Sequence, residues 1–166
     1  MKRLFTLLTI ALMSVAVNAQ ELPDVEVQNL QGQKIKASTL THDGPMVISF
    51  WATWCKPCIN ELNAMAEYYE ELHEDHNLRM IIISIDDPRT MRKVAPFVAS
   101  QGWEYEVLCD PNSALRRAMG VNNVPHTFLL DADGNIVWQA NKYVPGEEEE
   151  LVERIERVAA GEDLEE

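Results

Sequence analysis

The sequence predicts an α/β fold in which a mixed central β-sheet is flanked by helices. Segments with the hydrophobic pattern of strands alternate with segments that have the periodicity of amphipathic helices. Near the end of the chain two strand segments follow each other before a final helix. This order is typical of a sheet with parallel and antiparallel strands that is covered by helices. A length of 166 residues, with 46% hydrophobic and 25% charged residues, fits one globular domain.

The first expected elements are a β-hairpin and a buried strand. Extended segments at 25–27 and 34–36 are joined through Gly32, which is typical of a hairpin turn. The compact apolar run Met46–Trp51 then predicts a strand.

A long amphipathic helix is expected after this strand, because apolar residues recur at spacings of three and four. The residues in this pattern are Ile59, Leu62, Met65, Ala66, Tyr69, Leu72 and His76. Pro57 suits a first helical turn, where its missing N–H costs nothing, so the helix is predicted to begin at or beside Cys55.

The central part of the chain predicts a strand, a helix and a second strand. The unbroken apolar run 80–85 is typical of a strand covered on both faces. Segment 90–101 has helical character but contains Pro96, which predicts a late start or a kink. Apolar and acidic residues alternate over 103–107, which predicts a strand near an edge of the sheet.

The last third of the chain predicts a short helix, a hairpin and a closing helix. Segment 110–112 opens a short helix that Gly120 can close. Segment 131–135 is a hairpin signal between two expected strands, His126–Leu130 and Ile136–Ala140. The residues that mark the final amphipathic helix, which is expected to stop near Gly161, are Leu151, Ile155 and Val158.

Residues 1–19 have the pattern of a secretory signal peptide. Lys2 and Arg3 precede an apolar stretch that ends in small residues, and cleavage is expected after Ala19. A membrane anchor is the alternative, but the apolar run falls short of the ~20 residues that span a bilayer. No cysteine lies at the cleavage site, which argues against a lipid anchor. We therefore expect a mature domain of residues 20–166 in the periplasm or another exported location.

The acidic composition argues against nucleic acid or an anionic membrane as a partner. Removal of Lys2 and Arg3 with the leader changes the formal charge from -13 to -15. Binding to phosphate groups requires clustered basic residues, which such a surface lacks. The acidic run 147–150 has a simpler explanation, because carboxylates in a first helical turn complement the macrodipole.

The spacing of two of the three cysteines predicts thiol–disulfide exchange. Cys55 and Cys58 flank Lys56 and Pro57, between a buried strand and the start of a helix. The positive end of the helix and the charge of Lys56 favour a thiolate at Cys55, the expected nucleophile. Cys58 lies three residues further along the same helical face, within disulfide reach, and is the expected resolving thiol.

Four other residues have structural or functional interpretations. Cys109 cannot pair within the chain once the other two cysteines do, and is expected to be a buried, inert thiol, with an intermolecular or third redox role as the alternative. His126 is expected to be a hydrogen-bonded structural histidine, although a place near the cysteines is the alternative. Trp51 and Trp54 are expected to frame the site and offer apolar contact to a substrate, with Trp51 as a core residue in the alternative interpretation.

A zinc site of two cysteines and two histidines fails on geometry. His73 lies fifteen residues beyond Cys58 on one expected helix, which separates the two by ~22 Å at 1.5 Å per residue. Ligands of a single zinc ion all lie within ~2.3 Å of the metal. No metal is therefore expected.

The stretch from Phe50 to Cys58 (FWATWCKPC) resembles the active-site segment of the thioredoxin superfamily, in its exported TlpA-like and ResA-like branch. The resemblance extends over about 22–160 and implies a thioredoxin fold with a central βα insert. It also implies a cis-proline loop facing the cysteines, which segment 120–128 matches. Pro125 would be the cis residue, and Val124 would offer its backbone to an extended substrate segment.

The resemblance also concerns two positions near the cysteines. Similar proteins carry a glutamate three residues after the second cysteine, and Glu61 occupies that place. It would move protons or disfavour a thiolate by repulsion, and the alternative is a solvated carboxylate in the first turn. Many thioredoxins have a buried aspartate six residues before the first cysteine, but this chain has Ser49. Proton transfer would then depend on Glu61 or water.

The function expected from these residues is reduction of protein disulfides by an exported thioredoxin-like enzyme. In similar proteins this activity often serves cytochrome c maturation or the reduction of exported cysteines. The expected partners are protein thiol or disulfide substrates and an upstream thiol donor, with no bound cofactor beyond the redox-active cysteine pair. Two alternatives remain: an oxidase that forms disulfides, because direction depends on the reduction potential, and a non-catalytic copper or zinc carrier. A peroxidase does not require such a cysteine pair.

Overall fold

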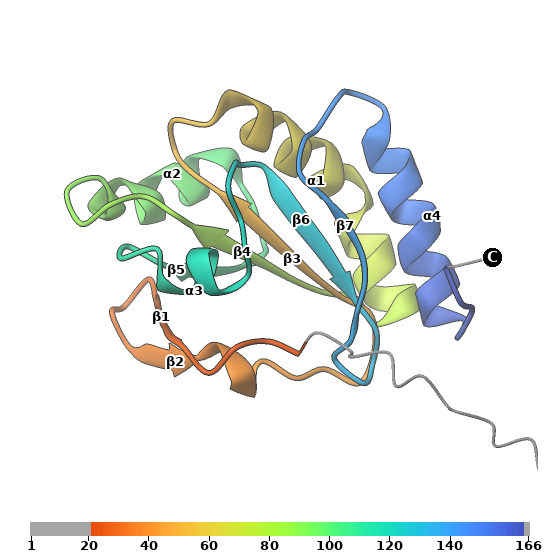
Figure 1. Cartoon of the computed structure of the whole chain (residues 1–166). Coiled ribbons are helices and arrows are strands. Elements are labelled where there is room, and N and C mark those ends of the chain that lie inside the picture. Colours follow the sequence, from red (N-terminus) through yellow and green to blue (C-terminus); the bar gives the residue numbers. More distant parts are fainter. Residues whose placement is uncertain (1–20, 165–166) are drawn as a thin grey trace, which may run out of the picture.

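The computed structural model of the chain describes residues 21–164 and contains one mixed seven-stranded β-sheet (Figure 1). The strands are β1 (Glu26–Asn29), β2 (Lys34–Lys36), β3 (Met46–Trp51), β4 (Arg79–Ser84), β5 (Glu106–Cys109), β6 (His126–Leu130) and β7 (Ile136–Ala140). The α-helices are α1 (Lys56–His76), α2 (Val94–Gln101), α3 (Ala114–Ala118) and α4 (Glu147–Ala159). This arrangement confirms the predicted α/β class.

The strand order is β2-β1-β5-β4-β3-β6-β7. Strands β3, β4 and β5 are parallel, whereas β6, β7, β1 and β2 pair antiparallel with their neighbours. Figure 1 shows α1, α2 and α4 on one side of the sheet and the short α3 on the other. Strand β3 lies inside the sheet between β4 and β6 and is buried along its whole length, which agrees with its continuous apolar sequence.

The N-terminal hairpin and the central insert are both present. Strands β1 and β2 pair antiparallel through a turn in which Gly32 has a φ of 79°. In the insert a short 3-10 turn, Met91–Lys93, precedes α2. Pro96 therefore lies in the first turn of α2, where no N–H is needed, and the predicted late start is confirmed.

The prediction of a strand near an edge at 103–107 was wrong in its position and in part of its extent. Strand β5 begins at Glu106 and lies between β4 and β1, inside the sheet. Trp103 and Tyr105 precede the strand and are buried against α1. The Trp103 indole N–H donates to Asn63 and the Tyr105 hydroxyl donates to the Leu62 carbonyl. Tertiary packing, not strand alternation, explains the burial of these two aromatic residues.

The predicted leader, residues 1–19, lies outside the described residues. Within residues 21–164, no helix has the length and apolar character that crossing a bilayer requires.

Candidate active site

The cysteine pair lies where β3 ends and α1 begins. Cys55 is the N-cap residue of α1, and its backbone N–H donates to the Ala52 carbonyl at 3.0 Å. Pro57 lies in the first turn, as its ring requires. Cys55 and Cys58 are joined by a disulfide bond. The predicted pairing of these cysteines is therefore confirmed.

The two sulfur atoms differ in exposure and in hydrogen bonding. Cys55 retains 6% of its surface exposed, whereas Cys58 has none. The backbone N–H of Cys58 donates to Sγ of Cys55 at 3.3 Å. A donor aimed at this sulfur, at the positive end of a helix, favours negative charge there. The geometry thus supports Cys55 as the sulfur that meets a substrate and Cys58 as the shielded partner.

The rim of the site is formed by residues that adjoin the cysteines in sequence. Trp54 is 63% exposed, and Lys56 and Pro57 are also exposed. Trp51, by contrast, is fully buried, and its ring lies 5.2 Å from the Trp103 ring in an edge-to-face arrangement. Of the two tryptophans expected to frame the site, only Trp54 is available to a substrate, and Trp51 is a core residue.

The proline loop lies at the same end of the sheet as the cysteines. The Val124–Pro125 peptide bond is cis, as the resemblance predicts. Strand β6 pairs antiparallel with β3, and His126 is in register with Phe50. The residues that precede β6 therefore lie beside those that follow β3. Val124 is half-buried and Pro125 is buried.

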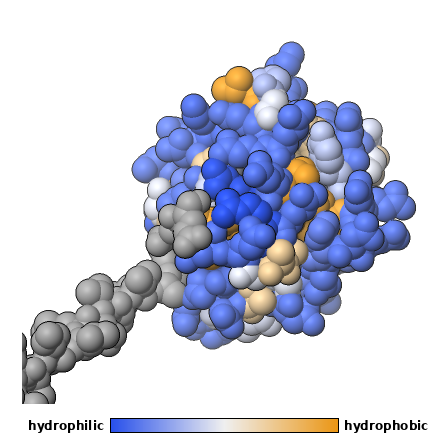
Figure 2. Space-filling view, turned by 90° about the vertical axis from the view of Figure 1, so that its right-hand side faces the viewer, coloured by the Kyte–Doolittle hydropathy of each residue, from blue (hydrophilic) through white to orange (hydrophobic). Residues whose placement is uncertain are grey.

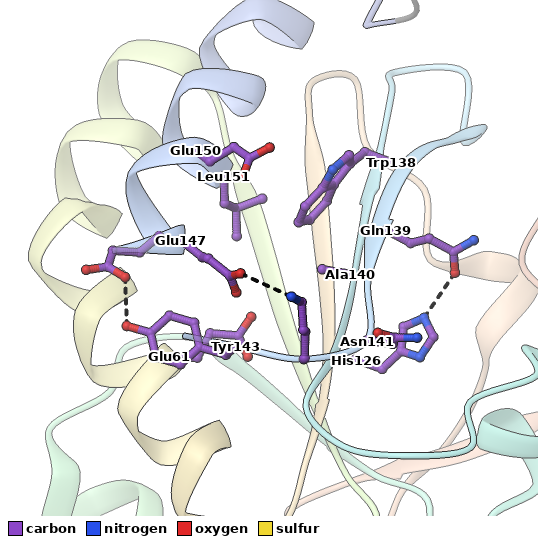
Figure 3. Close-up of a pocket in the computed structure, with 12 residues that line it drawn as sticks. Glu61, His126, Trp138, Gln139, Ala140, Asn141, Tyr143, Glu147, Glu150 and Leu151 are labelled. Carbon is purple, nitrogen blue, oxygen red and sulfur yellow. Dashed lines mark hydrogen bonds and ion pairs between the residues drawn. The ribbon is translucent and has the colours of Figure 1, made fainter. Parts of the chain in front are cut away.

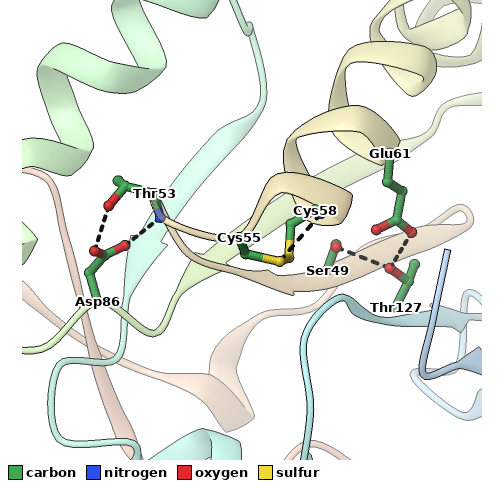
Figure 4. The surroundings of a disulfide bond; sticks show 7 residues. All are labelled: Ser49, Thr53, Cys55, Cys58, Glu61, Asp86 and Thr127. Carbon is green, nitrogen blue, oxygen red and sulfur yellow. Dashed lines mark hydrogen bonds between the residues drawn. A yellow bond between two sulfur atoms is a disulfide. The ribbon is translucent and has the colours of Figure 1, made fainter.

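Glu61 is buried beneath the site rather than solvated, so that alternative interpretation was wrong. Only 6% of the residue is exposed, and the Thr127 hydroxyl donates to its Oε1 at 2.7 Å. The same hydroxyl oxygen lies 3.0 Å from Oγ of Ser49. The Thr127 hydroxyl has one hydrogen, so it can donate to only one of these two partners. The Ser49 hydroxyl can therefore donate to Thr127 while Thr127 donates to Glu61. These two hydrogen bonds connect Glu61 with Ser49, which occupies the position of the buried aspartate in many thioredoxins (Figure 4).

Burial changes the acidity of Glu61. Desolvation raises its pKa from the ordinary value of 4.5 to about 7, against the opposing effect of the Thr127 hydrogen bond. Repulsion by Glu147 contributes in the same direction as burial. Near neutral pH this side chain can therefore both accept and release a proton, one helical turn from Cys58.

A second buried carboxylate, Asp86, was not identified from the sequence. It accepts hydrogen bonds from the backbone N–H and the hydroxyl of Thr53, at 2.8 and 2.7 Å, and from the Ser84 hydroxyl at 2.9 Å. These bonds fix the loop between β3 and Cys55, and Figure 4 shows the disulfide between this cluster and the Glu61 cluster. The available signal was an acidic residue just after the apolar run that forms β4, where functional residues of parallel sheets often lie.

A pocket of about 540 Å³ opens beside Glu61 and His126 (Figure 3). Nε2 of His126 lies 3.0 Å from Oε1 of Gln139, and its ring stacks on Phe128. The prediction of a hydrogen-bonded structural histidine is confirmed, and His126 also lines the pocket.

Cys109 takes no part in the disulfide, and the histidines of α1 lie far along the helix from the cysteine pair. Cys109 is a free, buried thiol on β5, which confirms the expected burial, and desolvation raises its pKa to about 11. Helix α1 is continuous from Lys56 to His76, so His73 lies four turns beyond Cys58. In residues 21–164 no group of three or more His, Cys, Asp or Glu side chains is arranged to hold a metal ion.

Comparisons with known proteins agree with this geometry. Residues 19–139 match the AhpC/TSA family. The thiol-disulfide oxidoreductase ResA of Bacillus anthracis is 35% identical over 120 residues, which are 72% of this chain and 67% of the relative. ResA of Bacillus cereus (strain ATCC 10987 / NRS 248) is 30% identical over 141 residues, which are 84% and 77% of the two chains.

Solved structures have the same fold. A thioredoxin-like protein from Porphyromonas gingivalis superposes with a TM-score of 0.76 at 38% identity, over 84% of this chain and 92% of its own. A protein from Chlorobium tepidum, described as a thiol:disulfide interchange protein DsbE, has a TM-score of 0.73 at 23% identity, over 85% and 96% of the two chains. The second similarity supports the fold alone.

Proposed function

Because the chain belongs to the AhpC/TSA family of the thioredoxin superfamily, and within it to the ResA-like thiol–disulfide oxidoreductases, we propose that it reduces disulfide bonds of exported proteins. The observation that carries this proposal is the Cys55 sulfur at the head of α1. It is the more exposed of the two sulfurs and accepts a backbone N–H. A thiolate there is stabilised for attack, and its partner lies within reach to complete the reaction.

The proposed reaction transfers two electrons from the dithiol to a substrate disulfide. The Cys55 thiolate attacks one substrate sulfur, which forms a mixed disulfide and releases the other substrate sulfur as a thiolate. The Cys58 thiolate then attacks Sγ of Cys55, which closes the Cys55–Cys58 bond and releases the second substrate thiol. Glu61 can take the proton that Cys58 loses. An upstream thiol donor reduces the disulfide for the next cycle.

The buried carboxylate supports the reducing direction. When ionised, Glu61 repels negative charge on the nearby sulfurs, which disfavours the dithiolate form relative to the disulfide. Strong oxidants owe their high potential to a stabilised reduced form, so this effect opposes an oxidase function. Cys55 and Cys58 remain the proposed catalytic residues, with Trp54, Lys56, Pro57, Val124 and Pro125 as the proposed substrate-positioning residues.

We place the activity outside the cytoplasm, in the periplasm or another exported location. The basic start, apolar centre and small residues of segment 1–19 support this assignment. The proposed substrates are exported proteins with cysteine pairs, including those of cytochrome c maturation. Sequencing of the protein isolated from its exported fraction tests the assignment, and a mature chain that begins at Gln20 is expected.

Trapping of mixed disulfides tests the roles of the two cysteines. In a Cys109→Ala background, Cys58→Ala should accumulate covalent adducts through Cys55, because no second thiol releases them. Cys55→Ala should accumulate none. Equal trapping by both variants would contradict the assignment.

The reduction potential tests the direction. Equilibration of the purified protein with glutathione mixtures is expected to give a value well below about −120 mV, the potential of a strong exported oxidant. A value near that potential would remove the reductase function in favour of the oxidase alternative.

A further inference from the structure

The pocket beside the active site lies between the end of β7, the loop that follows it and the first turn of α4. Its volume is about 540 Å³, and Figure 3 shows carboxylates of α1 and α4 on one side and β7 on the other. The surrounding face, which carries α4, is mainly hydrophilic, and its few hydrophobic residues are scattered (Figure 2). The pocket is therefore not part of an extended apolar surface.

The pocket has an excess of negative charge. Its lining contains four carboxylates, Glu61, Glu147, Glu148 and Glu150, and one lysine. Some of this charge is already engaged: Glu148 accepts from the Tyr143 hydroxyl, and Glu150 pairs with Arg154. Glu147 accepts the backbone N–H of Val144 through Oε2, and its Oε1 is 3.8 Å from a lysine that is 73% exposed, so its cationic partner is weakly held.

The floor of the pocket contains a polar atom without a partner. Oε2 of Glu61 is buried and has no hydrogen-bond partner among the residues that the structure describes. The macrodipole of α4 explains the carboxylates in its first turn, but the macrodipole of α1 does not explain Glu61, which lies beyond the first turn of that helix. Glu61 and Glu147 both line this pocket, and repulsion by Glu147 contributes to the raised pKa of Glu61. A buried acceptor of this kind is stabilised by a donor that enters the pocket.

The walls fit a side chain with a long aliphatic stem and a charged end. Trp138 and Tyr143 are half-buried and Leu151 is buried. Arg154 already lies over the Trp138 ring, with its guanidinium carbon 5.4 Å from the ring centroid, so this ring accepts a cation. Apolar and aromatic walls with acidic groups at the end suit lysine and arginine.

We propose that this pocket binds the side chain of a lysine or arginine that lies near the reactive disulfide in the substrate polypeptide. The inference rests on the proposed function and specifies its substrates. Glu61 is one helical turn from Cys58, and His126 directly follows the cis-proline, so the pocket adjoins the path of a bound substrate segment. The incoming cation replaces Lys142 beside Glu147 and donates to Oε2 of Glu61.

Matched disulfide peptides test this specificity. Each pair carries arginine or its neutral isostere citrulline at the same place, and that place is moved in turn along the sequence around the disulfide. The reduced protein is expected to prefer arginine by about tenfold in kcat/KM at one or two places. Equal rates for both peptides at every place would overturn the inference. Reduction of the citrulline peptides would at the same time leave the proposed function intact.

Variants of α4 separate the pocket from general electrostatic attraction. Glu147→Gln should lower the arginine-to-citrulline ratio several-fold. The control Glu149→Gln removes the same charge from an exposed position outside the pocket lining and should leave the ratio unchanged. An equal loss in both variants would assign the preference to the net charge and overturn the pocket.

Removal of the competing internal cation should act in the opposite direction. Lys142→Gln frees the position beside Glu147 and should raise the arginine-to-citrulline ratio about two- to threefold. The control Lys93→Gln removes an exposed cation from another part of the surface and should not change the ratio. A Lys142→Gln ratio equal to that of the wild type would contradict the proposed displacement.

Discussion

At the scale of residues, the burial of Glu61 could not be predicted from the sequence. Cys58 and Glu61 lie three residues apart near the start of the same helix. This spacing fits both a carboxylate that faces solvent and one that is buried. The structure decides between them, since α4 packs along α1 and Thr127 of β6 lies opposite. Neither of these elements is close to Glu61 in sequence. The residue could be singled out from the sequence, but its environment could not.

Replacement of Glu61 by glutamine should remove a pH dependence of stability. The unfolded chain ionises this carboxyl near pH 4.5 and the folded chain near pH 7. The folded state therefore binds the proton more tightly, and the wild type loses stability as the pH rises between these values, by about 3 kcal/mol in total. Chemical unfolding of the oxidised protein at pH 5 and pH 8 measures the loss.

The comparison between Glu61→Gln and wild type isolates this contribution from other titrating groups. The variant should be about as stable as the wild type at pH 5 and more stable at pH 8. The control Glu67→Gln changes an exposed carboxyl of the same helix and should leave the pH dependence unaltered. A variant with the same pH dependence as the wild type would show that Glu61 is not buried as described.

At the scale of elements, the bounds of three strands could be predicted to the residue, whereas β4, expected at 80–85, is shifted by one residue to Arg79–Ser84. The bounds of β3, β6 and β7 agree with those expected, because turn residues or a helix start lie directly beside each strand. Strand β5 could not be placed correctly, since the aromatic residues that precede it alternate with glutamates for a reason other than strand structure. Trp103 and Tyr105 pack on α1, and this contact joins parts of the chain that are 40 or more positions apart.

The contact between the loop before β3 and the end of α1 leads to a prediction for Gly44. A β-carbon at Gly44 would lie 2.7 Å from the backbone oxygen of Asn77, the left-handed C-cap of α1. Gly44→Ala should therefore lower the free energy of unfolding by about 1–3 kcal/mol, because a backbone atom must move. Denaturant unfolding measures the loss. Thr41→Ala, an exposed position in the same loop, should change stability by less than about 0.5 kcal/mol.

At the scale of the whole molecule, the sequence indicates the cysteine segment and the proline loop of the site. It does not indicate the part of the site that is formed by Asp86 and the pocket. The segment around the cysteines is contiguous, and the cis-proline could be expected from the resemblance. Asp86 and the pocket depend on how β4 and α4 are placed against β3 and α1. Their contacts join residues that are 33 positions apart for Thr53 and Asp86, and further for the pocket. Local patterns carry no information about such distances.

The oxidation state should change the stability of the whole fold in a direction that reports function. The disulfide closes a very short loop, with a sequence separation of 3, so its entropic contribution is about 2 kcal/mol or less. For a reductase the oxidised protein should be the more stable form, because the folded chain favours the disulfide. Urea unfolding with and without reductant compares the two forms. Greater stability of the reduced protein would indicate an oxidase.

The hydrogen bond from Thr127 to Glu61 joins positions that are 66 residues apart. If the chain is secreted as proposed, it crosses the membrane starting from its N-terminus. Both thiols then reach the far side of the membrane well before β6 does. During that interval the pair reacts as any unfolded dithiol would, without the enclosed acid or the proline loop. The rates of translocation and folding thus determine how long the two cysteines of a newly made chain can react with thiols and disulfides that are not its substrates.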